Sequence, residues 1–189
     1  MKRILLISLL LILALSISFG QIAYKKGDQV GSVMIGLGSF VYASGASSSL
    51  PPISLAYDYG YNENISFGGL LSYTSASETY DTYNYTGGFT YVPVTAKWTW
   101  SYIIIAARGA YHYDLLHNSN IDTYGGLMLG YEIASESSDN TSYPVSGTGS
   151  TMLFSIYVGG RYYFNPNLAV QAELGFGLAI LNIGVAYKF

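Results

Sequence analysis

The sequence predicts an all-β protein, an eight-stranded antiparallel up-and-down transmembrane β-barrel that is preceded by a cleavable signal peptide. Two observations support this prediction. Aliphatic and aromatic residues alternate with small or polar ones in segment after segment, which is the period of two that an extended chain produces. Helical spacing is nowhere sustained, so we expect no helix that could cover the apolar faces of the strands.

The first twenty residues have the layout of a secretory signal peptide. Two basic residues precede an apolar core at residues 4–17, and small residues stand just before a cleavage point at Gln21. A membrane anchor is the alternative, but this apolar core is shorter than the roughly 20 residues that a bilayer crossing requires. We therefore expect a signal peptide at residues 1–20 and one barrel domain at residues 21–189.

The composition excludes several classes of protein. The chain has no cysteine, so neither disulfides nor a thiolate metal site can stabilise it. Removal of the leader leaves six basic residues against eleven acidic ones, a net charge of −5. Nucleic acid is therefore not an expected partner, because its phosphates require a basic surface. No apolar stretch after residue 20 is long enough for a transmembrane helix, so only strands could cross a membrane.

The first three strands are expected at residues 29–42, 52–61 and 65–75. Between residues 53 and 61, the odd positions carry Ile, Leu and Tyr, while the even positions carry Ser, Ala, Asp and Gly. Between residues 65 and 74, the odd positions are mostly Ile, Phe, Leu and Tyr, and the even positions are mostly Ser, Gly and Thr. Each strand therefore has one apolar face and one face of small or polar residues.

The fourth strand has two interpretations. The segment WTWSY at 98–102 could be a turn between two strands, which would give an odd number of strands and place the loop at 134–150 beside the tight turns. One long strand at 97–113 instead restores the alternation of long and short connections, and we prefer it. The remaining strands are expected at residues 121–133, 151–164, 168–175 and 178–189. In the last two of them, apolar residues again occupy alternate positions.

The connections fall into two classes. The tight turns are rich in asparagine and lie at Asn62–Asn64, Leu116–Asn120 and Asn165–Asn167. The long connections are rich in Ser, Thr, Asn, Gly and Tyr and lie at 43–51, 76–96 and 134–150, with a fourth, very short one near Phe176. Both chain ends are then expected on the side of the tight turns.

A barrel is favoured over a soluble β-sandwich, which also shows alternation. The polar faces carry mostly Gly, Ala and Ser, which suits a cramped interior. The apolar faces are large and end in tyrosine and phenylalanine, as in the aromatic girdles of membrane barrels. Eight strands close into a barrel that side chains fill. Closure is required in lipid, because an open edge would leave backbone groups unpaired. We therefore expect the last strand to pair with the first.

The last strand resembles the insertion signal of Gram-negative outer-membrane barrels, with Ile183, Val185, Tyr187 and Phe189 on one face. The stretches ARGAYHYDLL, TYGGLMLGYEI and GGRYYFNPNLAVQAELGFG resemble a family of small eight-stranded outer-membrane β-barrel proteins related in architecture to OmpX and OmpW. The likeness covers nearly all of the chain after the leader. It implies a monomer in the cell outer membrane of a Gram-negative bacterium. It also implies three partners: outer-membrane lipid, lipopolysaccharide and the barrel assembly machinery.

Matching each strand to its alternation places a set of charged residues on the inward face. On the lipid-facing side an Arg or Lys would cost about 2–4 kcal/mol at mid-bilayer. The set is Asp58, Arg108, His112, Glu132, Arg161, Glu173 and Lys188. We expect Arg161 to pair with Glu173, directly or through water, and Arg108 to share Glu173 or Asp58. We interpret the set as a polar network that plugs the lumen, with a narrow selective pore or gate as the alternative.

The sequence favours a structural or surface-interaction role, such as envelope integrity, adhesion or recognition. A narrow pore or transporter for small or hydrophobic solutes is the alternative, followed by a lipid-modifying enzyme. Such an enzyme would combine Ser with His112 or His117, but one is expected inside the barrel near the tight turns and the other in a turn. We therefore assign no catalytic residue and do not expect an enzyme. The histidines lack metal-ligand spacing and the glycine pairs lack the context of a phosphate loop, so no metal or cofactor is expected.

The long connection at 76–96 has two interpretations. It contains five aromatic residues, Tyr80, Tyr83, Tyr85, Phe89 and Tyr91. The third and fourth strands could continue above the membrane as a hairpin. Alternatively, the connection could form a surface that binds a partner, a ligand or a carbohydrate, because tyrosine gives a broad contact at modest entropic cost.

Overall fold

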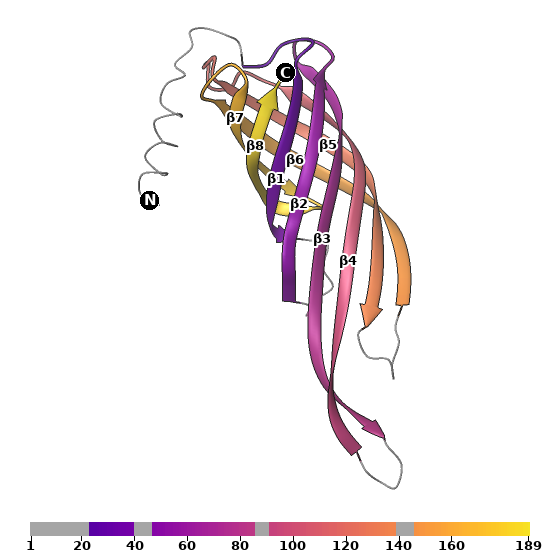
Figure 1. Ribbon diagram of the computed structural model, residues 1–189. Coiled ribbons are helices and arrows are strands. Elements are labelled where there is room, and N and C mark those ends of the chain that lie inside the picture. The colour runs from indigo at the N-terminus through magenta and orange to yellow at the C-terminus, as the bar shows by residue number, and fades with distance from the viewer. Residues whose placement is uncertain (1–22, 40–46, 86–90, 139–145) are drawn as a thin grey trace, which may run out of the picture.

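The fold is a closed barrel of eight antiparallel strands, seen in the computed structural model of Figure 1. The structure describes residues 23–39, 47–85, 91–138 and 146–189. The expected signal peptide lies outside the described residues. Within them, no helix is long and apolar enough to cross a membrane.

Each strand pairs with its neighbours in chain order, and the last pairs with the first. The strands are β1 (Gln29–Ser39), β2 (Ser47–Gly60), β3 (Ile65–Tyr85), β4 (Tyr91–His112), β5 (Ile121–Ser138), β6 (Ser146–Tyr163), β7 (Leu168–Phe176) and β8 (Ala179–Lys188). The β1–β8 seam runs from Val30 opposite Lys188 to Ser39 opposite Ala179. The predicted fold class, the number of strands and the closing pair are therefore confirmed.

The tight turns are built on asparagine side chains that replace missing backbone partners. The Asn62 amide oxygen accepts hydrogen bonds from the backbone N–H groups of Asn64 and Ile65, both at 2.8 Å. Asn118 and Asn165 make bonds of the same kind. The expected very short connection after Phe176 consists of residues 177–178, and Gly177 adopts a φ of 117° that other residues rarely adopt.

The strands of the middle of the sequence are longer than predicted. β3 and β4 were expected to meet the long connection at 76–96, but they continue through most of it and pair from Ile65 opposite Tyr111 to Tyr85 opposite Tyr91. WTWSY lies inside β4 and is not a turn. The sequence prediction ended these strands too early because their outer parts alternate polar and aromatic residues rather than aliphatic and small ones. Thr and Tyr nevertheless favour extended structure.

The outer parts of β3 and β4 leave the barrel as a two-stranded ribbon (Figure 1). β2 last pairs with β3 at Ser47 opposite Ser77, and β5 last pairs with β4 at Ser138 opposite Trp98. Beyond these pairs, no further strand in the described part of the chain flanks the ribbon. The continued hairpin is therefore present over residues 76–85 and 91–96, and Phe89 lies outside the described residues.

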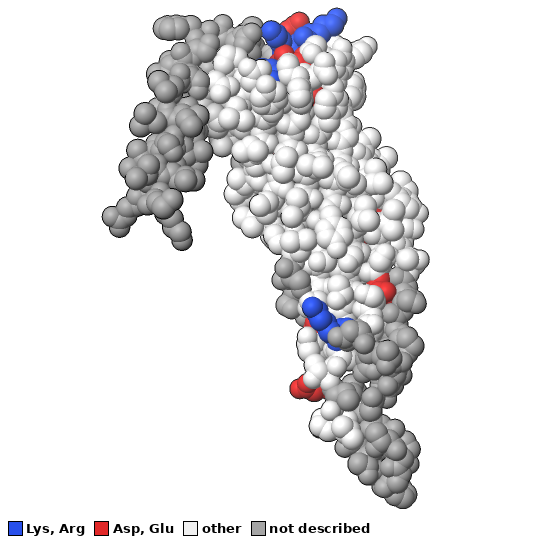
Figure 2. Space-filling model, viewed as in Figure 1, with Lys and Arg blue, Asp and Glu red and all other residues white. Residues whose placement is uncertain are grey.

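The outward face of the barrel is apolar. Val33, Ile105 and Val185 are 48%, 57% and 51% exposed, although they lie in the middle of their strands. On the face shown in Figure 2, one group of basic side chains lies at the top and another in the lower part, and the surface between them is largely uncharged. An exposed apolar surface of this extent on a soluble monomer would be unusual. It is the surface expected of a barrel whose strands are surrounded by hydrocarbon.

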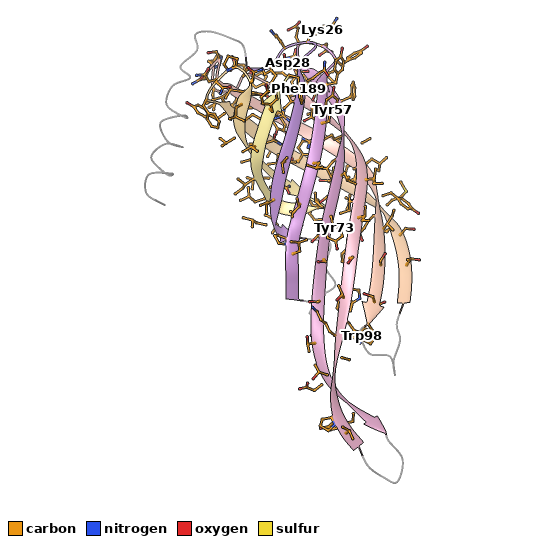
Figure 3. The ribbon with its side chains drawn as sticks, in the orientation of Figure 1. Lys26, Asp28, Tyr57, Tyr73, Trp98 and Phe189 are labelled. Carbon is orange, nitrogen blue, oxygen red and sulfur yellow. The ribbon has the colours of Figure 1, made fainter. Side chains whose placement is uncertain are left out.

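Outward aromatic side chains border this apolar surface at both ends. Tyr57 lies toward the end of the barrel where the described chain begins at Ala23 and ends at Phe189, called the terminus side below, and Tyr73 lies toward the ribbon (Figure 3). The terminus-side group is Tyr57, Tyr59, Tyr61, Phe67, Tyr111, Tyr113, Tyr162, Tyr187 and Phe189, and the ribbon-side group is Tyr73, Tyr131, Phe154 and Phe176. Two such groups match the aromatic girdles at the two interfaces of a bilayer.

The inside of the barrel contains an apolar cluster in its middle. Ile104 is fully buried and Met34 is 1% exposed. The cluster also contains Ala56, Leu70, Ala106, Ala110, Tyr124, Met128, Tyr157 and Leu178. Inward glycines make room for the rings, since a Cβ at Gly159 would lie 2.8 Å from the Tyr124 ring. The residues that form ion pairs lie on the terminus side of Met34 and Ile104.

Candidate functional site

The centre of the polar site is Asp58 on β2, which binds two arginines at once. Arg108 Nε on β4 lies 3.1 Å from its Oδ1, and Arg161 Nη2 on β6 lies 2.5 Å from its Oδ2. Arg108 Nη2 also lies 2.6 Å from Glu173 Oε1 on β7. These side chains are 1–5% exposed. Four strands therefore contribute one continuous ion-pair network, and Arg108 contacts both of the carboxylates between which the sequence left the choice open.

No direct ion pair joins Arg161 to Glu173, and Gln171 lies between them. Arg161 Nε donates to Gln171 Oε1 at 2.9 Å, and Gln171 Nε2 donates to Glu173 Oε1 at 2.8 Å. The reason is register, because Arg161 stands opposite Gln171 and Glu173 stands opposite Gly159. Glu173 is two residues farther along β7 than Gln171, and there it meets Arg108 instead.

Two tyrosine rings of the apolar cluster pack directly against the arginines. The Arg108 guanidinium carbon lies 4.5 Å from the centre of the Tyr157 ring, and that of Arg161 lies 4.8 Å from the centre of the Tyr124 ring. Tyr124 also donates its hydroxyl to Glu173 Oε1 at 2.9 Å. Cations over aromatic faces are stabilised further when they are desolvated. Both arginines are therefore held by carboxylates at the edges of the guanidinium and by a ring on its face.

His112 extends the network toward the barrel mouth on the terminus side. Its Nδ1 lies 2.7 Å from Asp122 Oδ1, and its Nε2 lies 2.9 Å from Ser66 Oγ. An ionised carboxylate only accepts, so Nδ1 carries a proton and, in the neutral ring, Nε2 accepts from the Ser66 hydroxyl. Asp122 Oδ2 lies 3.5 Å from Arg161 Nη1, which joins His112 to the arginines.

Ser66, Asp122 and Gln171 are among the members of this network that the sequence analysis did not assign. Asp122 and Glu132 both stand at even-numbered positions of β5, and Gln171 and Glu173 both stand at odd-numbered positions of β7. Because side chains of the same parity share a face of a strand, alternation would have placed Asp122 and Gln171 inside the barrel. Ser66 resembles the many other inward serines, and only its distance from His112 distinguishes it.

Ser66, His112 and Asp122 are connected in the order of a serine hydrolase triad. A nucleophile must also reach a substrate, and Ser66 is 1% exposed. The Tyr24 ring stacks on the imidazole with centres 3.6 Å apart. A cavity of about 420 Å³ is lined by His112 and Asp122, but Ser66 does not line it. The three residues therefore act as a buried hydrogen-bonded chain in this structure.

Residues 23–28 form a strap across the mouth of the barrel. Tyr24 donates its hydroxyl to the backbone oxygens of Ile65 at 2.6 Å and Asn62 at 3.1 Å, and it is 8% exposed. Burial raises the pKa of the Tyr24 phenol, so it remains a neutral donor. The strap thus closes the network from the side of the chain termini.

Lys188 fastens this strap to the last strand. Its Nζ donates to the backbone oxygen of Ala23 at 2.7 Å and to Asp28 Oδ2 at 3.0 Å. It also lies 4.5 Å from the centre of the Tyr163 ring. The ammonium therefore joins the residues before β1 to β8, beside the seam that closes the barrel.

Glu132 differs from the other six residues predicted for the lumen. It lies at an inward position of β5 and is half-buried, opposite Ile104 on one side and Thr151 on the other. Its carboxylate has no ion pair or hydrogen bond to any residue that the structure describes. The other six all take part in ion pairs or hydrogen bonds, in two groups centred on Asp58 and Lys188.

The four residues of the expected insertion signal lie at the seam. Ile183, Val185 and Tyr187 point outward from β8 and are 48–51% exposed, and Phe189 follows the strand and is 74% exposed. The Tyr187 and Phe189 rings meet edge to face with centres 5.2 Å apart.

No group of three or more His, Asp or Glu residues in the described part of the chain could hold a metal ion.

No protein-family model matches the chain, and no curated protein matches it in sequence. Solved structures do match. The N-terminal β-barrel domain of Pseudomonas aeruginosa OprF is 12% identical with a TM-score of 0.53, over 88% of this chain and 100% of that domain. The fold is that of a transmembrane β-barrel.

Two further structures resemble the chain at lower TM-scores. Ail, the attachment invasion locus protein of Yersinia pestis, in complex with the heparin analogue sucrose octasulfate, is 16% identical with a TM-score of 0.49, over 87% of this chain and 99% of that one. A de novo designed transmembrane β-barrel is 16% identical with a TM-score of 0.47, over 89% of this chain and 100% of that one.

Proposed function

We propose that this protein is an integral barrel of the Gram-negative outer membrane, with a lumen closed by side chains and a structural or surface-interaction role. Its apolar outer face, its two aromatic girdles and the fold it shares with the OprF barrel domain support the membrane location. It would be a monomer surrounded by lipopolysaccharide and outer-membrane lipid. The barrel assembly machinery would insert it through the last strand.

The observation that carries the surface role is the β3–β4 ribbon. Most of its described side chains are polar, charged or aromatic, and Tyr83 is 61% exposed, while Val92 is an apolar exception at 42% exposed. Asp81 and Thr95 lie opposite each other and are linked at 3.4 Å. A ribbon held by many cross-strand pairs is a defined surface, and an exposed tyrosine such as Tyr83 is an efficient contact residue. The ribbon stands farther from the termini than the rest of the barrel, on the side that would face outward (Figure 1).

Closure of the lumen is supported by burial in two successive layers. Arg108 and Arg161 are 3% and 1% exposed on the terminus side, and Met34 and Ile104 are 1% and 0% exposed in the middle. An eight-stranded barrel is only wide enough for its own side chains. This packing favours a closed barrel over the pore or transporter alternative.

The test removes the ribbon and keeps the barrel. A variant that joins Thr79 to Lys97 through Asn-Gly would be displayed on cells that lack other adhesins. Cell aggregation and binding to a glycan array are then measured. A matched control replaces residues 139–145 by Asn-Gly and leaves the ribbon intact. We expect the ribbon variant to insert normally and to lose attachment, while the control keeps it. Equal attachment by both variants and the full chain would refute the surface role.

A further inference from the structure

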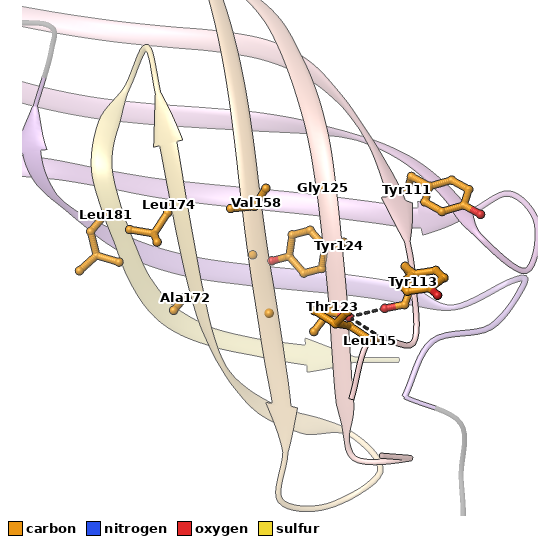
Figure 4. A pocket seen from close by; sticks show the side chains of 12 residues that line it. Tyr111, Tyr113, Leu115, Thr123, Tyr124, Gly125, Val158, Ala172, Leu174 and Leu181 are labelled. Atoms are coloured by element: carbon orange, nitrogen blue, oxygen red, sulfur yellow. Dashed lines mark hydrogen bonds between the residues drawn. The ribbon is translucent and has the colours of Figure 1, made fainter. Parts of the chain in front are cut away.

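The outer wall of the barrel contains a groove that crosses five strands on the terminus side (Figure 4). Its volume is about 610 Å³. It begins at Tyr111 on β4 and Tyr113 beyond it, continues over Gly125 on β5 and Gly160 on β6, and ends at Leu181 on β8. Nearly all of its lining is apolar. Neighbouring strands are about 4.8 Å apart, so four steps give a groove roughly 19 Å long.

The fold does not require the two glycines that form the floor. A Cβ at Gly125 would come no closer than 3.7 Å to any atom, and one at Gly160 no closer than 3.6 Å, which are ordinary contacts. The inward glycines next to them differ, because a Cβ at Gly126 or Gly159 would collide with a tyrosine ring. Glycine in a strand costs roughly 0.5–1 kcal/mol relative to alanine. The chain therefore keeps space on its outer face that its own packing does not use.

The ends of the groove differ in polarity. The end near the chain termini carries Tyr111 and Tyr113, which are 55% and 60% exposed, together with Thr123. Thr123 donates its hydroxyl to the backbone oxygen of Tyr113. The other end is formed by Leu174 and Leu181 near the middle of the wall (Figure 4). The groove is thus polar toward the bilayer interface and aliphatic toward the bilayer centre.

We propose that this groove binds one acyl chain of a phospholipid from the leaflet on the side of the chain termini. The groove is continuous with the apolar surface that faces hydrocarbon, so its occupant is apolar. The groove runs across strands that tilt about 35–45° from the bilayer normal in membrane barrels, so it descends by roughly 12 Å, which fits within the roughly 15 Å that one leaflet contributes to the hydrocarbon core. Within lipid there is no hydrophobic gain, so binding depends on van der Waals packing along the groove. The inference depends on the membrane location but not on the surface role.

The experiment locates lipid contacts by photolabelling. The full-length mature protein is reconstituted in phosphatidylethanolamine–phosphatidylglycerol vesicles with a trace of phosphatidylcholine whose acyl chain carries a diazirine. Labelled residues are mapped by mass spectrometry after illumination. We expect labels to concentrate on the groove residues relative to the β1–β3 wall. The double variant Gly125→Leu/Gly160→Leu should reduce groove labelling to the level of that wall.

The control is Gly69→Leu, an outward glycine of β3 whose Cβ would also have only an ordinary contact, at 3.6 Å. It should leave groove labelling unchanged. Gly125→Ala/Gly160→Ala is the milder pair if the leucine variant does not insert, and it should reduce labelling in part. Uniform labelling of the wild-type wall would overturn the proposal. The proposal would also be overturned if the groove variant were labelled as strongly as the wild type. A wild-type dimer that becomes a monomer in the groove variant would show that a second copy of the chain, rather than an acyl chain, occupies the groove.

Discussion

At the scale of single residues, the buried charges hold one another in place rather than merely adding stability. A buried ion pair contributes little over an apolar replacement, but removal of one partner leaves an uncompensated charge. Asp58 illustrates this, because Arg108 and Arg161 approach its two oxygens separately. Loss of either arginine would leave a carboxylate oxygen without its cation in a site closed to water.

Arg161→Met tests this dependence. Methionine keeps much of the side-chain length but leaves Asp58 and Asp122 without one of their cations. We expect the free energy of unfolding in phospholipid vesicles, measured by urea titration, to fall by about 3–5 kcal/mol. Lys26→Met is the control, since Lys26 is exposed and should change stability by less than about 0.5 kcal/mol. Equal stability of the two variants would show that the network is not a structural unit.

Tyr24→Ala tests the strap. The substitution removes the ring that covers His112 and the hydroxyl that binds Ile65. We expect diethyl pyrocarbonate to modify His112 slowly in the wild type and at a rate approaching that of exposed His117 in the variant, measured by peptide mass spectrometry. Tyr61→Ala, at an exposed tyrosine near the same mouth, should not change the rate. Rapid modification of His112 in the wild type would contradict the closed mouth.

At the scale of strands, alternation predicted which side chains point inward but not which of them meet. Parity placed Arg161 and Glu173 inside, yet the partner of each depends on the register between strands, and that register brings Gln171 to Arg161. Parity could also have placed Asp122 inside. The outer halves of β3 and β4 could not be predicted by the same rule, because above the membrane neither face needs to be apolar.

The β1–β8 seam depends on close approach at Gly184. A Cβ there would overlap the carbonyl oxygen of Val33 and lie 2.8 Å from the Met34 Cα. Gly184→Val should therefore prevent closure, seen as loss of the heat-dependent migration shift on gels after folding into vesicles. Gly69→Val is the matched outward substitution and should fold. Normal folding of Gly184→Val would show that the seam tolerates separation there.

At the scale of the whole molecule, the barrel has a closed interior, an apolar wall and a ribbon that projects beyond it. The closed interior predicts no ion conduction. Purified protein in planar bilayers should give no conductance steps above baseline, under conditions in which a known porin gives them. Regular steps from the wild type would instead support the pore alternative and would require the layers around Arg108 and Ile104 to open.

The central claim is that hydrocarbon covers the outward face of the barrel. Because the chain has no cysteine, single spin labels can be placed at outward positions on different strands, such as Val33, Ile105 and Val185, with Tyr83 on the ribbon as the water-exposed reference. In vesicles, the three wall labels should collide with oxygen and be shielded from a polar nickel chelate, while the Tyr83 label should collide with the chelate. Wall labels as accessible to the chelate as the Tyr83 label would contradict the membrane-spanning barrel.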